Sequence, residues 1–505
     1  MSGAAGMAAL PSAPQAAFDR FRAALERAGY TEGGVCSLYS IPSLRHLRLD
    51  EERIDNPTPP DDALRCLVRL FLECRYAPEQ RLVEHFGAET VAAMRELGVI
   101  EGTGDRVAGT VQLSPLAGLV VATDRWTDPD GRRLPAPEDI VYPAHAPNTL
   151  ILMASTSFRP SEAMLDLCAG TGIAGLFAAR TAQRVVACDV NPRASAYVEF
   201  NARLNGIPNV VTRTGDLWEP VAGETFDLVV AHPPYVPMFR QKWIFHSGGV
   251  DGEQISRQVI AGLPKHLRPG GRYTGLLMGS DRKDGTLEHR IRGWLGEAES
   301  EFDVALVQVR VFELDAFVES TVLKNGATLQ DAKLWRQKLD GLGVQRFLFC
   351  YLVIERTTEA RAVATARRTD GPQSGRPEYE WMLRLEQAAA DPRFAERILD
   401  TPLHPPFRSN LRIAHDLEGT TWAISGYTLH TDYPFRSEKP VPGWAAILAS
   451  KCDGTRTGRD FYEAYREAKL IPAEMSPYAF GLALQALVLA GSIELEGFRT
   501  PRAEG

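Results

Sequence analysis

The sequence predicts an α/β fold built on a central, mostly parallel sheet, with smaller α+β regions before and after it. Between about residues 139 and 356, short apolar strands alternate with helical patterns and end in Gly or Asp, which is typical of a parallel sheet. The length of 505 residues exceeds what one hydrophobic core usually supports and predicts several domains. Hydrophobic residues make up 44% and charged residues 24%, which indicates an ordered globular chain.

The charges, cysteines and histidines exclude several classes of protein. The 56 basic and 64 acidic residues give a net charge of −8, which argues against binding nucleic acid or lipid through bulk charge. The seven cysteines are widely spaced and form no C-x-x-C pair, so neither a disulfide framework nor a cysteine zinc site is favoured. We expect no metal site, because His404, His415 and His430 lack helical ligand spacing. The longest apolar runs are strand-length, so we expect a cytoplasmic protein without a membrane segment.

The first part of the chain is expected to form a tail and a helical domain. Residues 1–17 are rich in Ala, Pro, Ser and Gly and predict a flexible tail rather than a signal peptide. Residues 18–138 show the order of a winged helix, with helical patterns at 63–72, 79–86 and 89–97 before strand-like pieces at 99–101 and 107–113. The third of these helical patterns offers only Arg95 as a cation. A scaffold or docking role is therefore favoured over nucleic-acid binding.

Residues 139–356 are expected to form the sheet domain. Seven strands are predicted, at 163–167, 184–188, 210–213, 226–231, 271–278, 304–311 and 344–354. The last two are long and are separated by a helical pattern at about 330–342.

The sequence becomes polar after residue 356. Residues 357–378 predict a linker or a loop over the site, because the segment 370–377 has too little apolar content to pack. Residues 379–505 are expected to form a C-terminal domain. Its end repeats the winged-helix-like order, with helices at 444–450, 458–468 and 478–490 before a strand at 492–496.

The strongest indication of a binding site is the segment Asp166-Leu-Cys-Ala-Gly170-Thr-Gly172, between the first predicted strand and a helix. A glycine-rich turn lets a ligand approach the backbone closely. Gly175 completes the spacing of a dinucleotide fingerprint, so a nicotinamide cofactor is one interpretation. Asp166 favours S-adenosylmethionine instead, because a carboxylate repels a pyrophosphate but accepts a hydrogen bond from an ammonium group. The loop residues expected to bind this cofactor are Asp166, Cys168, Ala169, Gly170 and Gly172.

Two further carboxylates follow the next two strands. Asp189, with Val190 and Asn191 after it, is placed to accept hydrogen bonds from both ribose hydroxyls. Asp216 is placed to accept from the adenine amino group, while Leu217 and Val190 would sandwich the ring. Because the carboxyl ends of parallel strands meet at one edge of the sheet, these residues should line one crevice.

A fourth motif, His232-Pro233-Pro234-Tyr235, follows the strand at 226–231. Downstream lie Gly248-Gly-Val-Asp251-Gly252, Arg257 and Leu267-Arg-Pro-Gly-Gly271. In order and spacing, residues 163–271 resemble the class I N-methyltransferases with an (Asn/Asp/Ser)-Pro-Pro-(Tyr/Phe) motif. The HemK-type protein-glutamine methyltransferases are one branch of these enzymes. The overall layout is similar to a larger bacterial group of small-domain methyltransferases, with a winged-helix-like N-terminal region and an uncharacterised C-terminal region.

The resemblance implies a Rossmann-like, seven-stranded sheet whose last strand is antiparallel, and S-adenosylmethionine as cofactor. It also implies that the first motif residue and a proline carbonyl accept hydrogen bonds from the target nitrogen, while the aromatic residue packs on the substrate. His232, Pro233, Pro234 and Tyr235 are therefore the predicted catalytic residues. Catalysis would consist largely of positioning the nitrogen for in-line transfer.

His232 departs from the family, in which Asn is usual at this position. A neutral imidazole has one acceptor and one donor nitrogen, whereas an amide has a carbonyl acceptor and two N–H donors. His232 is expected either to accept from the target amine or act as a general base, or only to shape the loop while the Pro233 carbonyl accepts.

Additional site residues are expected on both sides of this core. Tyr142 and Thr149 lie in a segment that corresponds to a Pro-rich stretch over the methionine moiety in related enzymes. Phe239, Trp243 and His246 lie in an insertion after the fourth motif. With Tyr235 they are expected either to form the acceptor pocket or to pack as a lid.

Three functions are consistent with these features. The first is transfer of methyl from S-adenosylmethionine to a nitrogen of a protein, peptide or small molecule. The second is methylation of a DNA or RNA base that is flipped into the same motif. The third is a catalytically weak protein that binds the cofactor and docks partners. The intact cofactor residues argue against the third and the acidic balance argues against the second. The sequence leaves the oligomeric state open.

Overall fold

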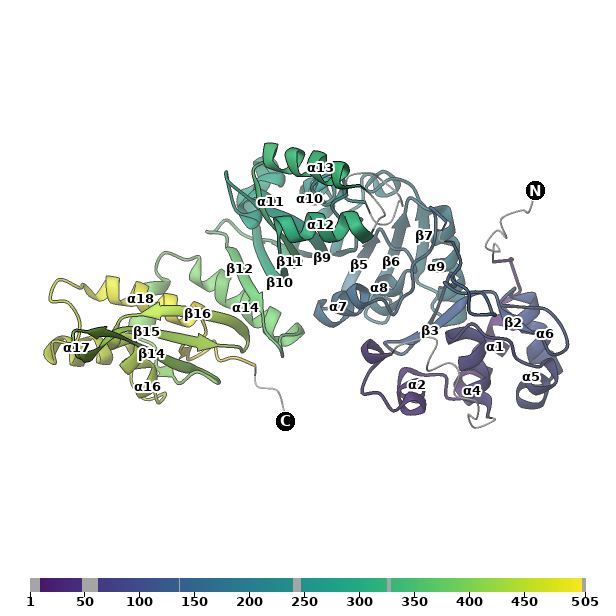
Figure 1. Cartoon of the computed structure of the whole chain (residues 1–505), viewed down its shortest axis with the longest axis horizontal. Helices are drawn as coiled ribbons and strands as arrows, with labels where there is room; N and C mark the ends of the chain where they lie inside the picture. Colours follow the sequence, from purple (N-terminus) through teal and green to yellow (C-terminus); the bar gives the residue numbers. More distant parts are fainter. Residues whose placement is uncertain (1–9, 48–61, 136, 239–246, 325–327, 502–505) are drawn as a thin grey trace. The chain divides into compact units, whose positions relative to one another are not determined.

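The computed structural model describes residues 10–47, 62–135, 137–238, 247–324 and 328–501 (Figure 1). The chain forms two compact units. The first comprises Met1–Met153 and Phe158–Leu277, and the second comprises Ala154–Ser157 and Met278–Gly505. The cofactor and catalytic residues predicted above belong to the first unit.

The first unit begins with helices and two strand pairs. The helical segments are α1 (Gln15–Arg27), α2 (Glu32–Tyr39), η1 (Leu44–His46), α4 (Ala63–Leu67) with η2 (Val68–Leu72), α5 (Glu79–Phe86) and α6 (Ala88–Glu96). The antiparallel pairs are β1 (Ile100–Glu101) with β2 (Ala108–Gly109) and β3 (Gln112–Leu116) with β4 (Leu119–Thr123). The helices predicted between residues 63 and 97 are present, and the strand predicted at 107–113 is divided between β2 and β3.

Part of the tail predicted over residues 1–17 is ordered. Helix α1 begins at Gln15, and the side chains of Ala13 and Ala17 are buried. The Arg203 guanidinium also donates a hydrogen bond to the Ala13 carbonyl at 2.5 Å. Alanine favours helices and is small enough for close packing, so an Ala-rich composition does not by itself indicate a flexible segment. Residues 1–9 of the predicted tail lie outside the described residues.

The sheet of the first unit positions the candidate site. Its strands are β5 (Ser161–Leu167), β6 (Ala182–Asp189), β7 (Val210–Thr214), β8 (Phe226–Ala231) and β9 (Leu267–Arg282, to Leu277 in this unit). They are parallel and lie in the order β9-β8-β5-β6-β7. The strand order therefore reverses at β5, and in open α/β sheets such a reversal creates a crevice at the carboxyl ends of the strands.

Helices connect these strands. They are α8 (Ile173–Ala178), α9 (Pro192–Leu204), η3 (Glu219–Val221) and α10 (Gln254–His266), while α7 (Pro147–Ser155) precedes β5. Helix α8 packs on β5 and β6, and α9 packs on β6 and β7 (Figure 1).

The second unit contains the remaining two predicted sheet strands, β10 (Phe302–Glu313) and β11 (Val344–Arg356), which are antiparallel to each other. All seven predicted strands are thus present. This unit also has β12 (Thr365–Asp370), parallel to β10, and its strands lie in the order β14-β15-β16-β12-β10-β11. The last three are β14 (Asn410–Glu418), β15 (Thr421–Thr431) and β16 (Phe435–Val441).

Helices and one further strand pair complete the second unit. Its helical segments are α11 (Leu287–Trp294), η4 (Gly296–Glu301), α12 (Leu314–Lys324), α13 (Leu329–Gly341), α14 (Arg376–Ala389), α15 (Phe394–Leu399), α16 (Gly443–Lys451), α17 (Gly458–Glu467) and α18 (Pro477–Leu489). Strand β13 (Leu403–His404) pairs with β17 (Glu494–Leu495). No helix of the described residues is long and apolar enough to cross a membrane.

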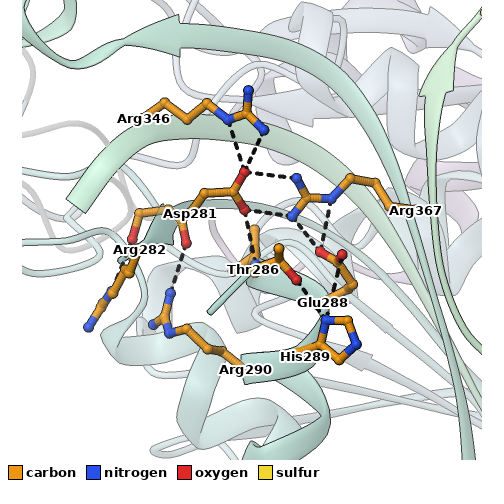
Figure 2. A network of polar contacts seen from close by, with 10 residues as sticks. Asp281, Arg282, Thr286, Glu288, His289, Arg290, Arg346 and Arg367 are labelled. Carbon is orange, nitrogen blue, oxygen red and sulfur yellow. Dashed lines mark hydrogen bonds and ion pairs between the residues drawn. The ribbon is translucent and has the colours of Figure 1, made fainter. Parts of the chain in front are cut away.

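The segment predicted as a linker or loop, residues 357–378, contains strand β12 and the start of α14. A buried ionic cluster explains how so polar a segment packs (Figure 2). Arg367 of β12 donates to the Asp281 carboxylate at 2.8 and 2.6 Å and to Glu288 at 2.9 Å. Arg346 of β11 contacts Asp281 at 2.8 Å. Both carboxylates are buried, so long-range charge neutralisation, rather than local apolar content, stabilises this strand.

The cluster controls the ionisation of Asp281. Burial alone would raise the pKa of its carboxyl group, but hydrogen bonds from Arg367, from the Leu287 N–H and from Arg346 outweigh burial and lower the pKa to about 2. A carboxyl group with a lowered pKa stabilises the fold above its ordinary pKa of about 4 and loses this contribution as the pH falls through 2.

We expect Arg367→Met to lower the free energy of unfolding by about 3–5 kcal/mol at pH 7, because it leaves two buried carboxylates without their shared cation. Denaturant unfolding measures this loss. The difference from the wild type should shrink as the pH falls from about 4 to about 2, because the Asp281 carboxylate becomes protonated.

Arg393→Met is the matched control, because Arg393 forms an ion pair with Asp391 while its side chain is 79% exposed. Exposed pairs contribute roughly 1 kcal/mol or less. A loss at Arg367 no larger than that at Arg393 would contradict a structural role for the cluster.

Candidate active site

The glycine-rich loop after β5 adopts a backbone that requires its glycines. The φ angles of Cys168, Gly170 and Gly172 are 59°, 53° and 75°. A Cβ atom at Gly172 would lie 2.8 Å from the side chain of Val198 in α9, so this glycine allows the loop to pack on the helix. A Cβ atom at Gly170 would meet no atom within 4 Å. The backbone at Gly170 therefore borders open space at the end of the sheet, where a ligand can approach it.

Asp166 lies beneath this loop at the end of β5. Its side chain is buried, and one carboxylate oxygen accepts a hydrogen bond from the Gly175 N–H in α8 at 2.8 Å. Burial raises the pKa of Asp166 to about 7; the hydrogen bond from Gly175 lowers it and the nearby Asp189 raises it. At neutral pH the group is thus close to its titration midpoint. A cationic ligand would favour its ionised form.

Asp189 joins the loops that follow β5 and β6. One of its oxygens accepts from the Gly170 N–H at 2.8 Å and the other from the Asn191 N–H at 2.9 Å. Burial raises the pKa of Asp189 despite these hydrogen bonds. Each carboxylate oxygen has a second lone pair, so Asp189 can also accept from hydroxyl groups of a ligand.

The residues after β6 and β7 lie at the same end of the sheet. Val190 is exposed although it is apolar, and Leu217 has a φ of 45° in the loop that carries the exposed Asp216. Burial raises the pKa of the Cys168 thiol, and so do three nearby carboxylates, Asp189, Asp166 and Asp216. The three predicted acids therefore lie around one point of the glycine-rich loop.

These residues fit S-adenosylmethionine. Asp166 would pair with an ammonium group and Asp189 would accept from ribose hydroxyls, and the backbone at Gly170 borders open space beside them. The exposed apolar side chain of Val190 suits one face of a planar base.

The four motif residues 232–235 follow β8 beside these loops. The rings of His232 and Tyr235 stack with centroids 5.5 Å apart and an interplanar angle of 22°. The Asn148 amide donates to the Tyr235 hydroxyl at 2.7 Å, and that hydroxyl lies 3.3 Å from His232 Nε2. Burial lowers the pKa of His232 to about 4, so the imidazole is neutral at physiological pH.

The glycines of residues 248–252 hold this motif in place. A Cβ atom at Gly248 would lie 2.7 Å from the Tyr235 Cα, and one at Gly252 would lie 2.5 Å from the Tyr235 carbonyl oxygen. The Gly248 N–H donates to the Val236 carbonyl at 3.0 Å. Positions 248 and 252 are therefore glycines because the backbone there packs directly on that of Tyr235.

A segment upstream is fixed against the same loops. The buried Asp124 accepts from the Arg193 guanidinium at 2.9 and 2.6 Å, and Arg193 also donates to the Asp139 carbonyl. Asn191 donates to the same carbonyl at 2.7 Å and accepts from the Arg193 N–H. Both side-chain groups of Asn191 are thus used in contacts within the protein.

The remaining predicted residues have diverse environments. Tyr142 is exposed and packs edge-on against Trp126, with ring centroids 5.5 Å apart, whereas Thr149 is buried in α7. Ala169 donates its N–H to the Cys188 carbonyl at 3.0 Å and so connects the loop to β6. Three predicted substrate residues, Phe239, Trp243 and His246, lie outside the described residues.

Sequence reasoning missed Asn148, Asp124 and Arg193. Asn148 was detectable only as a polar neighbour of Thr149 after Pro147, and Arg193 only as part of the helix start Asn191-Pro-Arg. Asn148 lies 87 residues from Tyr235, and Asp124 lies 69 residues from Arg193, so no local pattern reveals these contacts.

Comparison with known proteins gives one family and a consistent group of relatives. Residues 147–289 match the family described as "Methyltransferase small domain". A protein of Methanocaldococcus jannaschii provisionally named as a protein N5-glutamine methyltransferase is 30% identical over 149 residues, which are 28% of this chain and 74% of that protein. The release factor glutamine methyltransferase of Cereibacter sphaeroides is 33% identical over 156 residues, 28% of this chain and 55% of that enzyme.

A third relative is the ribosomal protein uL3 glutamine methyltransferase of Bradyrhizobium diazoefficiens, 31% identical over 28% of this chain and 49% of that enzyme. The chain thus spans about half the length of these two named enzymes. Among solved structures, the ribosomal protein L11 methylase of Lactobacillus delbrueckii has 20% sequence identity and a TM-score of 0.23, covering 39% of this chain and 71% of that chain.

We expect the affinity for S-adenosylhomocysteine to fall by up to about tenfold per pH unit below pH 7, because Asp166 must lose its proton to pair with the ligand's ammonium group. Calorimetry at pH 5.5–8 measures the affinity. Repeating it in buffers of different ionisation enthalpy should show a proton released on binding at pH 6.

Asp166→Asn should remove both effects, whereas Asp216→Asn, which changes an exposed carboxylate of the same crevice, should keep them. A wild-type affinity that is flat from pH 5.5 to 8 would exclude Asp166 as the partner of the ammonium group.

Proposed function

Since the chain belongs to the methyltransferase small-domain family, we propose that it methylates a nitrogen atom of a protein acceptor. It is a class I methyltransferase, and its cofactor is S-adenosylmethionine. When bound, the cofactor supplies an electrophilic methyl group.

The relatives support a protein as the acceptor. The named enzymes methylate glutamine in release factors and in ribosomal protein uL3, and the M. jannaschii relative is named for the same protein-glutamine chemistry. A side-chain amide of a protein is therefore the acceptor that we propose. The small-molecule acceptor considered from the sequence has no such support.

The observation that carries this proposal is the chain of contacts Asn148–Tyr235–His232 beside the cofactor loops. The Tyr235 oxygen accepts from Asn148, so its hydrogen can be donated to His232 Nε2. A neutral His232 with an accepting Nε2 carries its proton on Nδ1. In that tautomer Nδ1 is a donor, which suits the carbonyl oxygen of an amide acceptor.

This arrangement divides the binding of an amide between two groups. His232 Nδ1–H would hold the amide oxygen, and the Pro233 carbonyl would accept an N–H of the amide nitrogen. Tyr235 would pack against the amide plane. The expectation that His232 accepts directly from the target nitrogen is thus replaced by a donor role, which fixes the same nitrogen through the other end of the amide. In-line positioning of this kind supplies much of the rate enhancement.

The acceptor class is testable by label transfer. The protein is incubated with labelled S-adenosylmethionine and a lysate divided into protein, nucleic-acid and small-molecule fractions. We expect the label in the protein fraction, and in glutamine after complete enzymatic digestion. Label confined to the nucleic-acid fraction would contradict the proposal and favour base methylation.

We expect His232→Ala to lower the rate of label transfer by about 10²–10⁴ with little change in the affinity for S-adenosylhomocysteine. His232→Asn should retain more activity, because an amide keeps an N–H donor. Since the pKa of His232 is about 4, its protonation should not reduce wild-type activity above about pH 5.

Asn148→Ala is the companion variant, because Asn148 acts only through Tyr235. It should lower the rate by up to about 10²-fold, the cost of a misplaced group. If His232→Ala turns over at the wild-type rate, His232 only shapes the loop and the assignment fails.

A further inference from the structure

The hairpin of β14 and β15 projects beyond the rest of its sheet. Strand β15 pairs with β14 along nearly its whole length, but only its last five residues, Tyr427–Thr431, pair with β16. The outer part of the hairpin, residues 414–418 of β14 with residues 421–426 of β15, is therefore a two-stranded arm. All nine residues of β14 are exposed. A two-stranded hairpin is only marginally stable in water without further strands or a covering helix.

One face of the hairpin is apolar. Residues directly opposite each other in an antiparallel pair point to the same face, and Leu417 lies opposite Trp422 while His415 lies opposite Ile424. The apolar residues of this face are 45–66% exposed: Leu411, Ile413, Leu417, Trp422 and Ile424. A contiguous group of this kind marks an interaction site.

The free edge of β14 has few of the features that prevent strand pairing. Strand β14 is the terminal strand of the sheet order, and within the described residues no other strand pairs with its outer side. It is nine residues long and contains no proline. The register shift between Ala414 and His415 places its extra residue, Ser425, on β15 and leaves the edge of β14 continuous. Long, continuous edges are usually covered in native proteins.

We propose that β14 pairs antiparallel with β14 of a second copy of this chain, about a twofold axis at Ala414. The proposal is independent of the proposed function. In a symmetric antiparallel pair, the residue at the axis faces itself and the others pair at equal distances from it. Ala414 is the midpoint of Asn410–Glu418, so this register alone pairs all nine residues.

The charges favour the same register. With the axis at Ala414, Arg412 faces Asp416 of the second copy, twice by symmetry, and Leu411 faces Leu417. An axis at Arg412 or at Asp416 would place like charges opposite each other, which destabilises a strand pair. An axis at Ile413 or His415 would pair fewer residues. Arg412 also contacts Glu438 at 3.4 Å, but both side chains are mostly exposed, and such a pair is worth little.

Second-copy pairing also fits the arm better than a nucleic acid does. The side chains of β14 include one arginine, Arg412, against two acids, Asp416 and Glu418. A ribbon that binds phosphates needs a surplus of cations. Pairing with a second copy joins the two hairpins into a four-stranded sheet, and a sheet of three or more strands with a hydrophobic face can be independently stable.

Cysteine cross-linking tests the register. Residues facing each other at the axis have Cβ atoms about 4.5–5.5 Å apart, close enough for a disulfide after a small adjustment. Ala414→Cys should therefore form a covalent dimer under mild oxidation. Ala423→Cys is the matched control: Ala423 faces Asp416 within the arm, on the inner strand β15, and should remain uncross-linked.

Light scattering after size exclusion tests the dimer and its charges. The wild type should be a dimer. Asp416→Arg should raise the dimer dissociation constant at least about tenfold, because it places an arginine opposite Arg412 in both symmetric pairs. The double variant Arg412→Asp/Asp416→Arg should restore the dimer. Trp422→Lys, on the apolar face but not at the edge, should have the smaller effect.

Three results would overturn the proposal. A wild type that stays monomeric at tens of micromolar means that the edge is not a self-association site. A dimer that Asp416→Arg leaves intact associates through another surface. A dimer that Trp422→Lys dissociates while Ala414→Cys fails to cross-link uses the apolar face and not the edge. In each variant, a denaturant-unfolding transition like that of the wild type shows that the second unit, which carries the substitution, is folded.

Discussion

The hydrogen bonds that Asp189 accepts from Gly170 and Asn191 are the interaction on which the candidate site depends. They join the loops after β5 and β6 at the point where the strand order reverses. The loop can take this path only because Gly172 allows close contact with Val198. A carboxylate held by two backbone N–H groups is both a structural element and, through its remaining lone pairs, a binding group.

The acceptor side of the site depends on a comparable contact between loops. The backbone at Gly248 and Gly252 packs on Tyr235 of the motif at 232–235, and Asn148 donates a hydrogen bond to the Tyr235 hydroxyl. These supports fix Tyr235, and Tyr235 in turn fixes the tautomer that we propose for His232. Under this proposal, the replacement of the usual asparagine by histidine would change which end of an amide is held, while the amide nitrogen would still lie beside the proline carbonyl.

Local patterns in the sequence predict the strands and the positions of the acids at their ends, because apolar strands ending in Gly or Asp are a short-range signal. They fail where long-range charge pairs decide the structure. The sequence of strand β12 predicts a polar linker, because the acids that neutralise Arg367 lie 79 and 86 residues away. Asn148 was missed for the same reason, 87 residues from Tyr235. The hairpin β14–β15 was only partly predicted, because both faces of β14 are exposed and its burial pattern does not alternate.

Methylation of the side-chain nitrogen of a protein amide, which we propose for this site, can be tested by tandem mass spectrometry of the methylated acceptor. The acceptor is isolated from a lysate after reaction with isotopically labelled S-adenosylmethionine, and its peptides are fragmented. We expect a single labelled methyl group on the side-chain nitrogen of a glutamine, and it should form about 10²–10⁴-fold more slowly when His232→Ala replaces the wild type. A labelled methyl group on a carboxylate, a thiol or a nucleobase would contradict it.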